Sequence, residues 1–150
     1  MKEVHATLLA AIESELPLRL DEVDQYWGSC VMLGGRTPGG SPAYLRVYLC
    51  DWKLARDDDL FATSDGSVQE NRDGLWGLLG TQLMSLKISL KRRRVRSDFD
   101  SGHVLMMYVN LEAYGEDATL FFSSWPIGMI SFKHTVGIAL EPHADPMNPN

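Results

Sequence analysis

The sequence is poor in cysteine and has no long apolar run. Its two cysteines, Cys30 and Cys50, each lie inside an apolar stretch, away from any C-x-x-C or histidine-rich spacing. A disulfide framework is therefore not expected, and buried free thiols are typical of the cytoplasm. No segment reaches the ~20 apolar residues of a membrane span, and Glu3, His5 and Glu13 interrupt the N-terminal stretch that a secretion signal would need. We predict a cytoplasmic protein without membrane contact.

Basic residues are in deficit. Fourteen Lys and Arg stand against twenty Asp and Glu, a formal net charge of −6. General binding to nucleic acid or anionic membranes needs a basic footprint, so the composition excludes both as general functions. The 45% of hydrophobic residues is ordinary for a globular protein, and 150 residues suffice for a core. We predict one domain over residues 1–141 and a proline-rich tail over residues 142–150.

Recognisable catalytic and metal-binding motifs are missing. There is no G-x-S-x-G elbow and no cysteine–histidine signature. The glycine-rich segment Gly34–Ser41 lacks the Gly-Lys-Ser/Thr ending of a phosphate loop, and Asp98–Gly102 lacks the remaining oxygen ligands of a calcium loop. No cofactor or metal is therefore expected. The sequence leans against an enzyme, although a hydrolase that uses His103 or His134 in a site assembled from distant residues stays open.

Apolar periodicity indicates an α+β fold. Residues 3–16 carry an apolar stripe at steps of four, which predicts an N-terminal helix that ends at Pro17. Residues 18–27 favour a second short helix, with Leu20, Val23 and Trp27 on one side, whereas the alternation of Leu18 and Leu20 is typical of a strand. Residues 30–33 and 43–54 are apolar runs that predict two strands, and the loop between them is so rich in glycine and proline that we expect a hairpin.

The rest of the chain predicts an antiparallel meander. Residues 56–73 are acidic and small-polar, which is typical of a loop. Residues 75–84 carry leucines at helical spacing but also glycines, so a short helix or irregular piece is expected there. The predicted strands that follow cover residues 85–96, 103–114, 118–124 and 129–140. We expect the N-terminal helix to pack on a mostly antiparallel sheet of about five or six strands.

The bases are gathered in one place. Six of them lie between Lys87 and Arg96, so the other 140 residues carry eight bases against twenty acids, a net of −12. On a strand, Arg92, Arg94 and Arg96 would share one face and could contact phosphate or an acidic partner. The alternative, of equal weight, is that the cluster pairs internally with the acids Asp98, Asp100, Glu112 and Glu116.

Tryptophan is the other residue type that indicates contact surfaces. Core packing is the default for each of the four tryptophans, but one or two at a partly exposed edge would mark an interface, because tryptophan is enriched at binding hot spots. The four are Trp27, Trp52, Trp76 and Trp125.

A competent core, polarised charge and no catalytic motif together predict a binding protein. We expect a small acidic inhibitor or immunity-type protein, bacterial or phage, that blocks a toxin or defence enzyme by stoichiometric protein–protein binding. The stretch from Asp51 to Gly66, with the leucine-rich segment after it, resembles baseplate-wedge proteins, which implies a structural or assembly component of a phage or secretion apparatus as the alternative. The sequence is also compatible with a homo-oligomer. The candidate contact residues are Asp57, Asp58, Asp59, Arg92, Arg94 and Arg96.

Overall fold

The computed structural model describes most of the chain. The described residues are 2–26, 30–48, 50–89, 91–108, 119–124, 128–133 and 137–141. Their helices and strands are α1 (Lys2–Glu13), β1 (Leu18–Gln25), β2 (Val31–Arg36), β3 (Pro42–Tyr48), β4 (Asp51–Arg56), β5 (Asp59–Thr63), α2 (Val68–Trp76), β6 (Gln82–Ser89), β7 (Arg94–Phe99), β8 (Val104–Tyr108), β9 (Thr119–Ser124), β10 (Gly128–Lys133) and β11 (Gly137–Glu141). The predicted tail over residues 142–150 lies outside this part.

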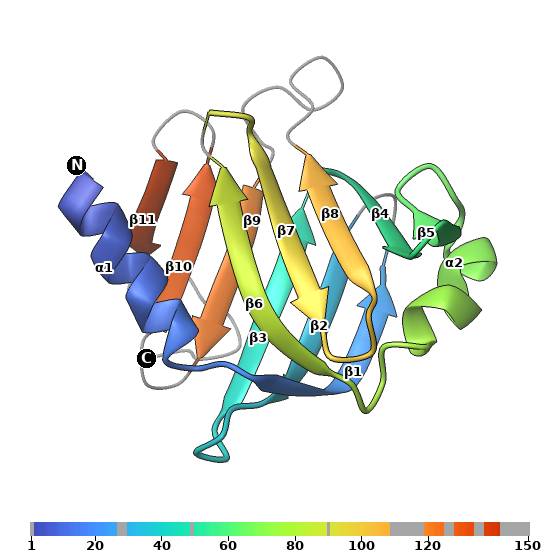
Figure 1. Ribbon diagram of the computed structural model, residues 1–150, viewed down its shortest axis with the longest axis horizontal. Coiled ribbons are helices and arrows are strands. Elements are labelled where there is room, and N and C mark those ends of the chain that lie inside the picture. The colour runs from blue at the N-terminus through green and yellow to red at the C-terminus, as the bar shows by residue number, and fades with distance from the viewer. Residues whose placement is uncertain are drawn as a thin grey trace.

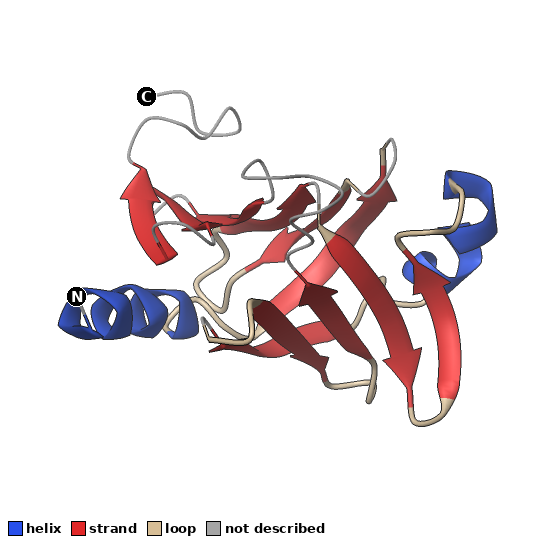
Figure 2. Ribbon diagram, turned by 90° about the horizontal axis from the view of Figure 1, so that it is seen from above, coloured by secondary structure: helices blue, strands red, loops and turns tan. Residues whose placement is uncertain are grey.

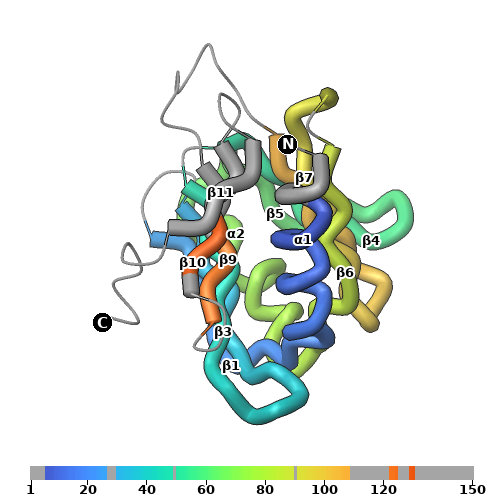
Figure 3. Tube along the Cα trace, turned by 90° about the vertical axis from the view of Figure 1, so that its left-hand side faces the viewer, coloured from blue at the N-terminus to red at the C-terminus, as the bar shows by residue number. Residues whose placement is uncertain are grey.

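The described strands form one curved antiparallel sheet. Their order is β11-β10-β9-β3-β2-β1-β6-β7-β8-β4-β5. The sheet curls so that β6, β7 and β8 pass in front of β2 and β3 (Figure 1), and the view from above shows the same curvature (Figure 2). Helix α1 packs against β11 and lies between the β9–β10 part of the sheet and β6 (Figure 3). This confirms the predicted α+β class, the N-terminal helix and the C-terminal run of antiparallel strands.

The inner face of the curved sheet and α1 together form the core. Ile12 of α1 is buried, and Leu8 and Leu16 of the same apolar stripe pack against the core. The largest fully buried side chains are Trp52, Phe122, Ile12, Leu18, Leu20, Leu33, Leu45, Leu54, Leu75, Leu78, Leu83 and Leu105. Both cysteines are free thiols, with Cys50 buried and Cys30 half-buried. None of the described helices is both long and apolar enough to cross a membrane.

The helix expected over residues 18–27 is wrong, because residues 18–25 form the strand β1. Its pairing with β2 is irregular between Leu20 and Glu22, where a bulge adds one residue. The bulge shifts the alternation, so Val23 is buried with Leu18 and Leu20. Apolar residues at 18, 20 and 23 therefore imitate a helical spacing. Opposite the bulge the chain needs Gly35, since a Cβ there would lie 1.9 Å from the Arg19 carbonyl oxygen.

The estimate of about five or six strands was too low for three reasons, the first of which is that β1 replaces the helix expected over residues 18–27. Three predicted long strands are each broken in two. Residues 43–54 hold most of β3 and most of β4, residues 85–96 hold most of β6 and the start of β7, and residues 129–140 hold most of β10 and β11. The loop expected over residues 56–73 instead contains β5 and most of α2.

The break within residues 85–96 changes the predicted arginine face. Residues 91–93 form the turn between β6 and β7, and the turn is closed by the Arg92 N–H, which donates to Ser89 Oγ at 3.2 Å. Arg92 therefore does not share a strand face with Arg94 and Arg96. Leu86, Ile88 and Leu90 alternate with polar residues up to the turn, and this pattern favoured a strand that continues beyond it.

Candidate functional site

A buried asparagine fixes α2 to the sheet. Asn71 is 4% exposed, and its Nδ2 donates to Gln25 Oε1 at 2.9 Å and to the Thr63 carbonyl at 2.7 Å. Its Oδ1 accepts from the Thr63 N–H at 3.2 Å. One side chain thus joins α2 to β1 and β5. Gly74 lets the helix come close to β5, because a Cβ there would lie 2.3 Å from the Phe61 carbonyl oxygen.

A capping box sets where α2 begins. Ser67 Oγ accepts from the Glu70 N–H at 3.1 Å, and Glu70 Oε1 accepts from the Ser67 N–H at 3.4 Å. With the helix starting at Val68, the residues at steps of four, Val68, Arg72 and Trp76, lie along one side of it.

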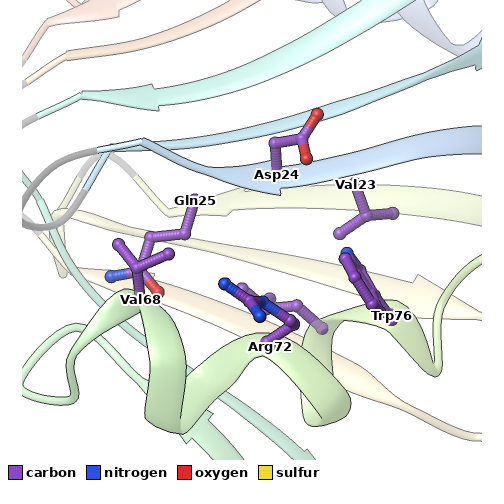
Figure 4. A pocket seen from close by; sticks show the side chains of 7 residues that line it. Val23, Asp24, Gln25, Val68, Arg72 and Trp76 are labelled. Carbon is purple, nitrogen blue, oxygen red and sulfur yellow. The ribbon is translucent and has the colours of Figure 1, made fainter.

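This side of α2 faces β1 across a pocket of about 310 Å³ (Figure 4). Val23 and Gln25 point from β1 toward the helix, whereas the Asp24 carboxylate points away from it (Figure 4). Leu75 is buried and contributes to the lining, so the pocket wall is mainly apolar. The lining residues are Val23, Asp24, Gln25, Val68, Arg72, Leu75 and Trp76.

Trp76 and Arg72 form the rim of the pocket. Trp76 is 49% exposed, and the Arg72 guanidinium lies 5.6 Å from the centre of its ring, within cation–π range. Leu79, just beyond the helix, is also an exposed large hydrophobic residue. Trp76 thus departs from the core packing expected by default, whereas Trp52 is buried in the core. Trp27 and Trp125 lie outside the described residues.

The outer face of β1 is acidic. Burial raises the pKa of Glu22, and the charge of neighbouring Asp24 raises it further. Burial also raises the pKa of Tyr26, with Asp24 and Glu22 adding to the effect. Tyr44 lies against this face, because a Cβ at Gly34 would be 2.9 Å from its ring. These side chains give the strand that lines the pocket a negative and aromatic outer surface.

The residues that the sequence predicted for binding lie elsewhere, in two separate groups. Asp57, Asp58 and Asp59 are exposed in and beside the β4–β5 turn. Arg94, at the start of β7, pairs with Tyr108, at the end of β8. Val104, at the start of β8, pairs with Ala55 of β4, which lies next to the β4–β5 turn. The aspartates and the arginine turn are therefore at opposite ends of these strands, and the structure does not bring them together.

The arginine cluster is partly paired. Arg96 Nε donates to Asp98 Oδ1 at 3.0 Å, and Lys87 Nζ lies 3.9 Å from Asp98 Oδ2. Arg92 and Arg94 have no ion pair in the part of the chain that the structure describes. Glu112 and Glu116 lie outside that part, and Asp100 Oδ1 accepts from the Gln82 N–H.

His103 is held in a structural turn. It is buried, its Nδ1 lies 2.7 Å from Ser101 Oγ, and its ring packs against Phe61 with centroids 5.1 Å apart. Burial lowers the pKa of His103, and the positive charge of Arg56 lowers it further. Among the described contacts of His103 there is no carboxylate at hydrogen-bond distance, and it does not line the pocket. His134 lies outside the described residues.

Sequence reasoning missed the pocket because its walls come from distant segments. The Ser67–Glu70 capping box and the Val68, Arg72, Trp76 spacing could have located the helix. Within the described ranges, no group of three or more His, Cys, Asp or Glu could hold a metal. No protein-family model, no curated protein and no solved structure matches this chain.

Proposed function

We propose that the protein acts by stoichiometric protein–protein binding through the α2–β1 pocket and its rim. The observation that carries this proposal is the half-exposed Trp76, which lies beside an apolar pocket and is backed by Arg72. Tryptophan and arginine are the residues most enriched at binding hot spots, where an anchor is packed next to a desolvated pocket.

The size of the pocket supports a protein partner. Pockets for small molecules span roughly 300–1,000 Å³, and this pocket is at the lower limit at about 310 Å³. It therefore suits one or two side chains that project from a partner better than an enclosed cofactor. The Asn71 contacts hold α2 in place before binding, so little backbone entropy is lost in the complex.

The proposal extends to the manner of action. A small inhibitor or immunity-type protein needs a rigid complementary surface that covers the working face of its target, and it needs no reacting groups of its own. The hydrogen bonds of Asn71 that fix α2 to β1 and β5 support a rigid surface of this kind. The target in this proposal is a toxin or defence enzyme of bacterial or phage origin, whose activity falls when one copy of this chain binds.

The experiment compares Trp76→Ala with Leu60→Ala. Leu60 is the more exposed of the two side chains, at 60%, and it does not line the pocket. Tagged wild type captures a partner from the native host, and the purified pair is then measured by titration calorimetry. We expect one partner per chain, about thirtyfold weaker binding for Trp76→Ala and less than a twofold change for Leu60→Ala.

Two results would contradict the proposal. The first is a partner that binds Trp76→Ala and Leu60→Ala with the same affinity, because the pocket rim would then not be the contact surface. The second is a partner whose own activity is unchanged at saturating concentrations of wild type, which would remove the inhibitor function and leave binding alone.

A further inference from the structure

The turn between β6 and β7 and the first residue of β7 present four cations in succession, Lys91, Arg92, Arg93 and Arg94, here called the basic turn. Lys91, Arg92 and Arg93 are exposed, and Arg94 is half-buried. None of the four has an ion pair within the described ranges of the chain. The basic turn is therefore a compact positive surface at one end of the hairpin.

The same hairpin contains cations that are neutralised. Asp98 lies between Lys87 and Arg96, with its Oδ1 3.0 Å from Arg96 Nε and its Oδ2 3.9 Å from Lys87 Nζ. Ser85 Oγ also donates to this carboxylate, at 3.2 Å. Among the described residues, internal pairing therefore involves Lys87 and Arg96 on the strands and none of the cations of the basic turn.

The backbone of the basic turn is a second observation that indicates function. Arg93 has a φ of 52°, in the left-handed region that glycine and asparagine enter at lower cost than other residues. Four neighbouring cations also repel one another. The hydrogen bond from Arg92 to Ser89 keeps the turn ordered. An arginine that lowers stability in an ordered turn is expected where binding has been selected over stability.

We propose that the basic turn docks an acidic surface of a protein partner. Outside these four residues the chain has ten bases against twenty acids. A long polyanion such as a nucleic acid would extend over this negative remainder and be repelled. An acidic patch on a folded partner can instead be confined to the turn. Such contacts mainly raise the association rate and fix the orientation of the partner.

The basic turn goes beyond the proposed function, since it shares no residue with the α2–β1 pocket. The test uses fluorescence anisotropy with two labelled probes, a peptide of eight glutamates and an oligothymidylate of twenty nucleotides. The test variant is Lys91→Gln/Arg92→Gln/Arg93→Gln. The control is Arg19→Gln/Arg36→Gln/Lys53→Gln, which removes the same charge from three exposed side chains elsewhere on the sheet.

The expected result is that the acidic peptide binds wild type and the control alike, and binds the test variant at least about tenfold more weakly. The difference should shrink as salt rises to about 150 mM, because screening weakens exposed charge interactions. Equal binding of the peptide to all three proteins would overturn the proposal. Tighter binding of the oligothymidylate, lost in the test variant, would overturn it in favour of nucleic acid.

A stability measurement tests the backbone observation independently. Arg93→Gly should raise Tm by about 2 °C while it weakens binding of the acidic peptide. An unchanged or lower Tm would remove the claim that Arg93 is retained against its conformational preference. Once a partner is purified, loss of binding in Trp76→Ala but not in the test variant would leave the proposed function and reject the basic turn, and the opposite pattern would do the reverse.

Discussion

Asn71→Ala should weaken the whole fold, because it removes the side chain that joins three elements. The Asn71 Nδ2 is within hydrogen-bond distance of Gln25 Oε1, the Thr63 carbonyl and the Gly66 carbonyl, at 2.9, 2.7 and 3.3 Å. Its two hydrogens can satisfy two of these acceptors fully, and Oδ1 accepts a further bond from Thr63. Three effective hydrogen bonds at about 1 kcal/mol each give a loss of about 3 kcal/mol in the free energy of unfolding.

The assay is urea unfolding followed by tryptophan fluorescence, with circular dichroism as a second probe. At about 3 kcal/mol the variant should melt roughly 10 °C below wild type, with a lower urea midpoint and an unchanged m-value. Gln69→Ala is the matched control, since Gln69 is exposed on the same helix. A double-mutant cycle with Gln25→Ala should give a coupling energy of about 1 kcal/mol.

The refuting result is a loss below about 1 kcal/mol, or a loss equal to that of Gln69→Ala. Either outcome would mean that water or neighbouring groups satisfy the partners of Asn71 as well as the amide does. A zero coupling with Gln25 would remove the α2 to β1 link in particular, while leaving the contacts with β5.

Further predictions concern the helix, the turn histidine and the acidic face. Gly74→Ala should lower stability by about 2 kcal/mol in urea unfolding, because the clash with the β5 backbone exceeds the ~1 kcal/mol of helix propensity that alanine returns. Ser67→Ala should cost about 1 kcal/mol in the same assay through loss of the cap. Because the pKa of His103 is lowered in the folded state, its contribution to stability is present above pH 6.5 and is lost as the pH falls below 6.5. His103→Gln should therefore reduce the dependence of the free energy of unfolding on pH between pH 7 and 5. Because the pKa of Glu22 is raised in the folded state, its ionisation opposes folding as the pH rises above 4.5. In thermal melts Glu22→Gln should therefore have a higher Tm than wild type at pH 7, and this difference in Tm should disappear below pH 4.5.

Local signals in the sequence predicted the parts of the fold that depend on neighbouring residues. The stripe of Leu8, Ile12 and Leu16 predicted the N-terminal helix, and the glycine- and proline-rich segment between β2 and β3 predicted their hairpin. The bulge after Leu20 could not be predicted in this way, because it exists only through pairing with β2. The β6–β7 turn was equally hidden, since Arg93 carries no turn preference of its own.

The candidate site depended on contacts that no local pattern encodes. Val23 and Trp76 line one pocket although they come from distant parts of the chain, and the bond from Asn71 to Gln25 spans 46 positions. The sequence showed the charge cluster that contains Arg92 and Arg94, and it led to the prediction, still untested, that an exposed tryptophan marks an interface. Placement of Trp76 beside an apolar pocket required the tertiary structure.

The order of strands has a consequence for how the chain folds. β3 pairs with β9 along its length, from Ala43 with Ser124 to Tyr48 with Thr119, although β4 to β8 lie between them in the sequence. Pairings this distant close slowly, because the intervening chain must first lose its freedom. Before β9 pairs with it, β3 is an exposed edge strand, so the last three strands complete the sheet late. Truncation of these strands would leave the β3 edge open to pairing with another chain and would promote aggregation.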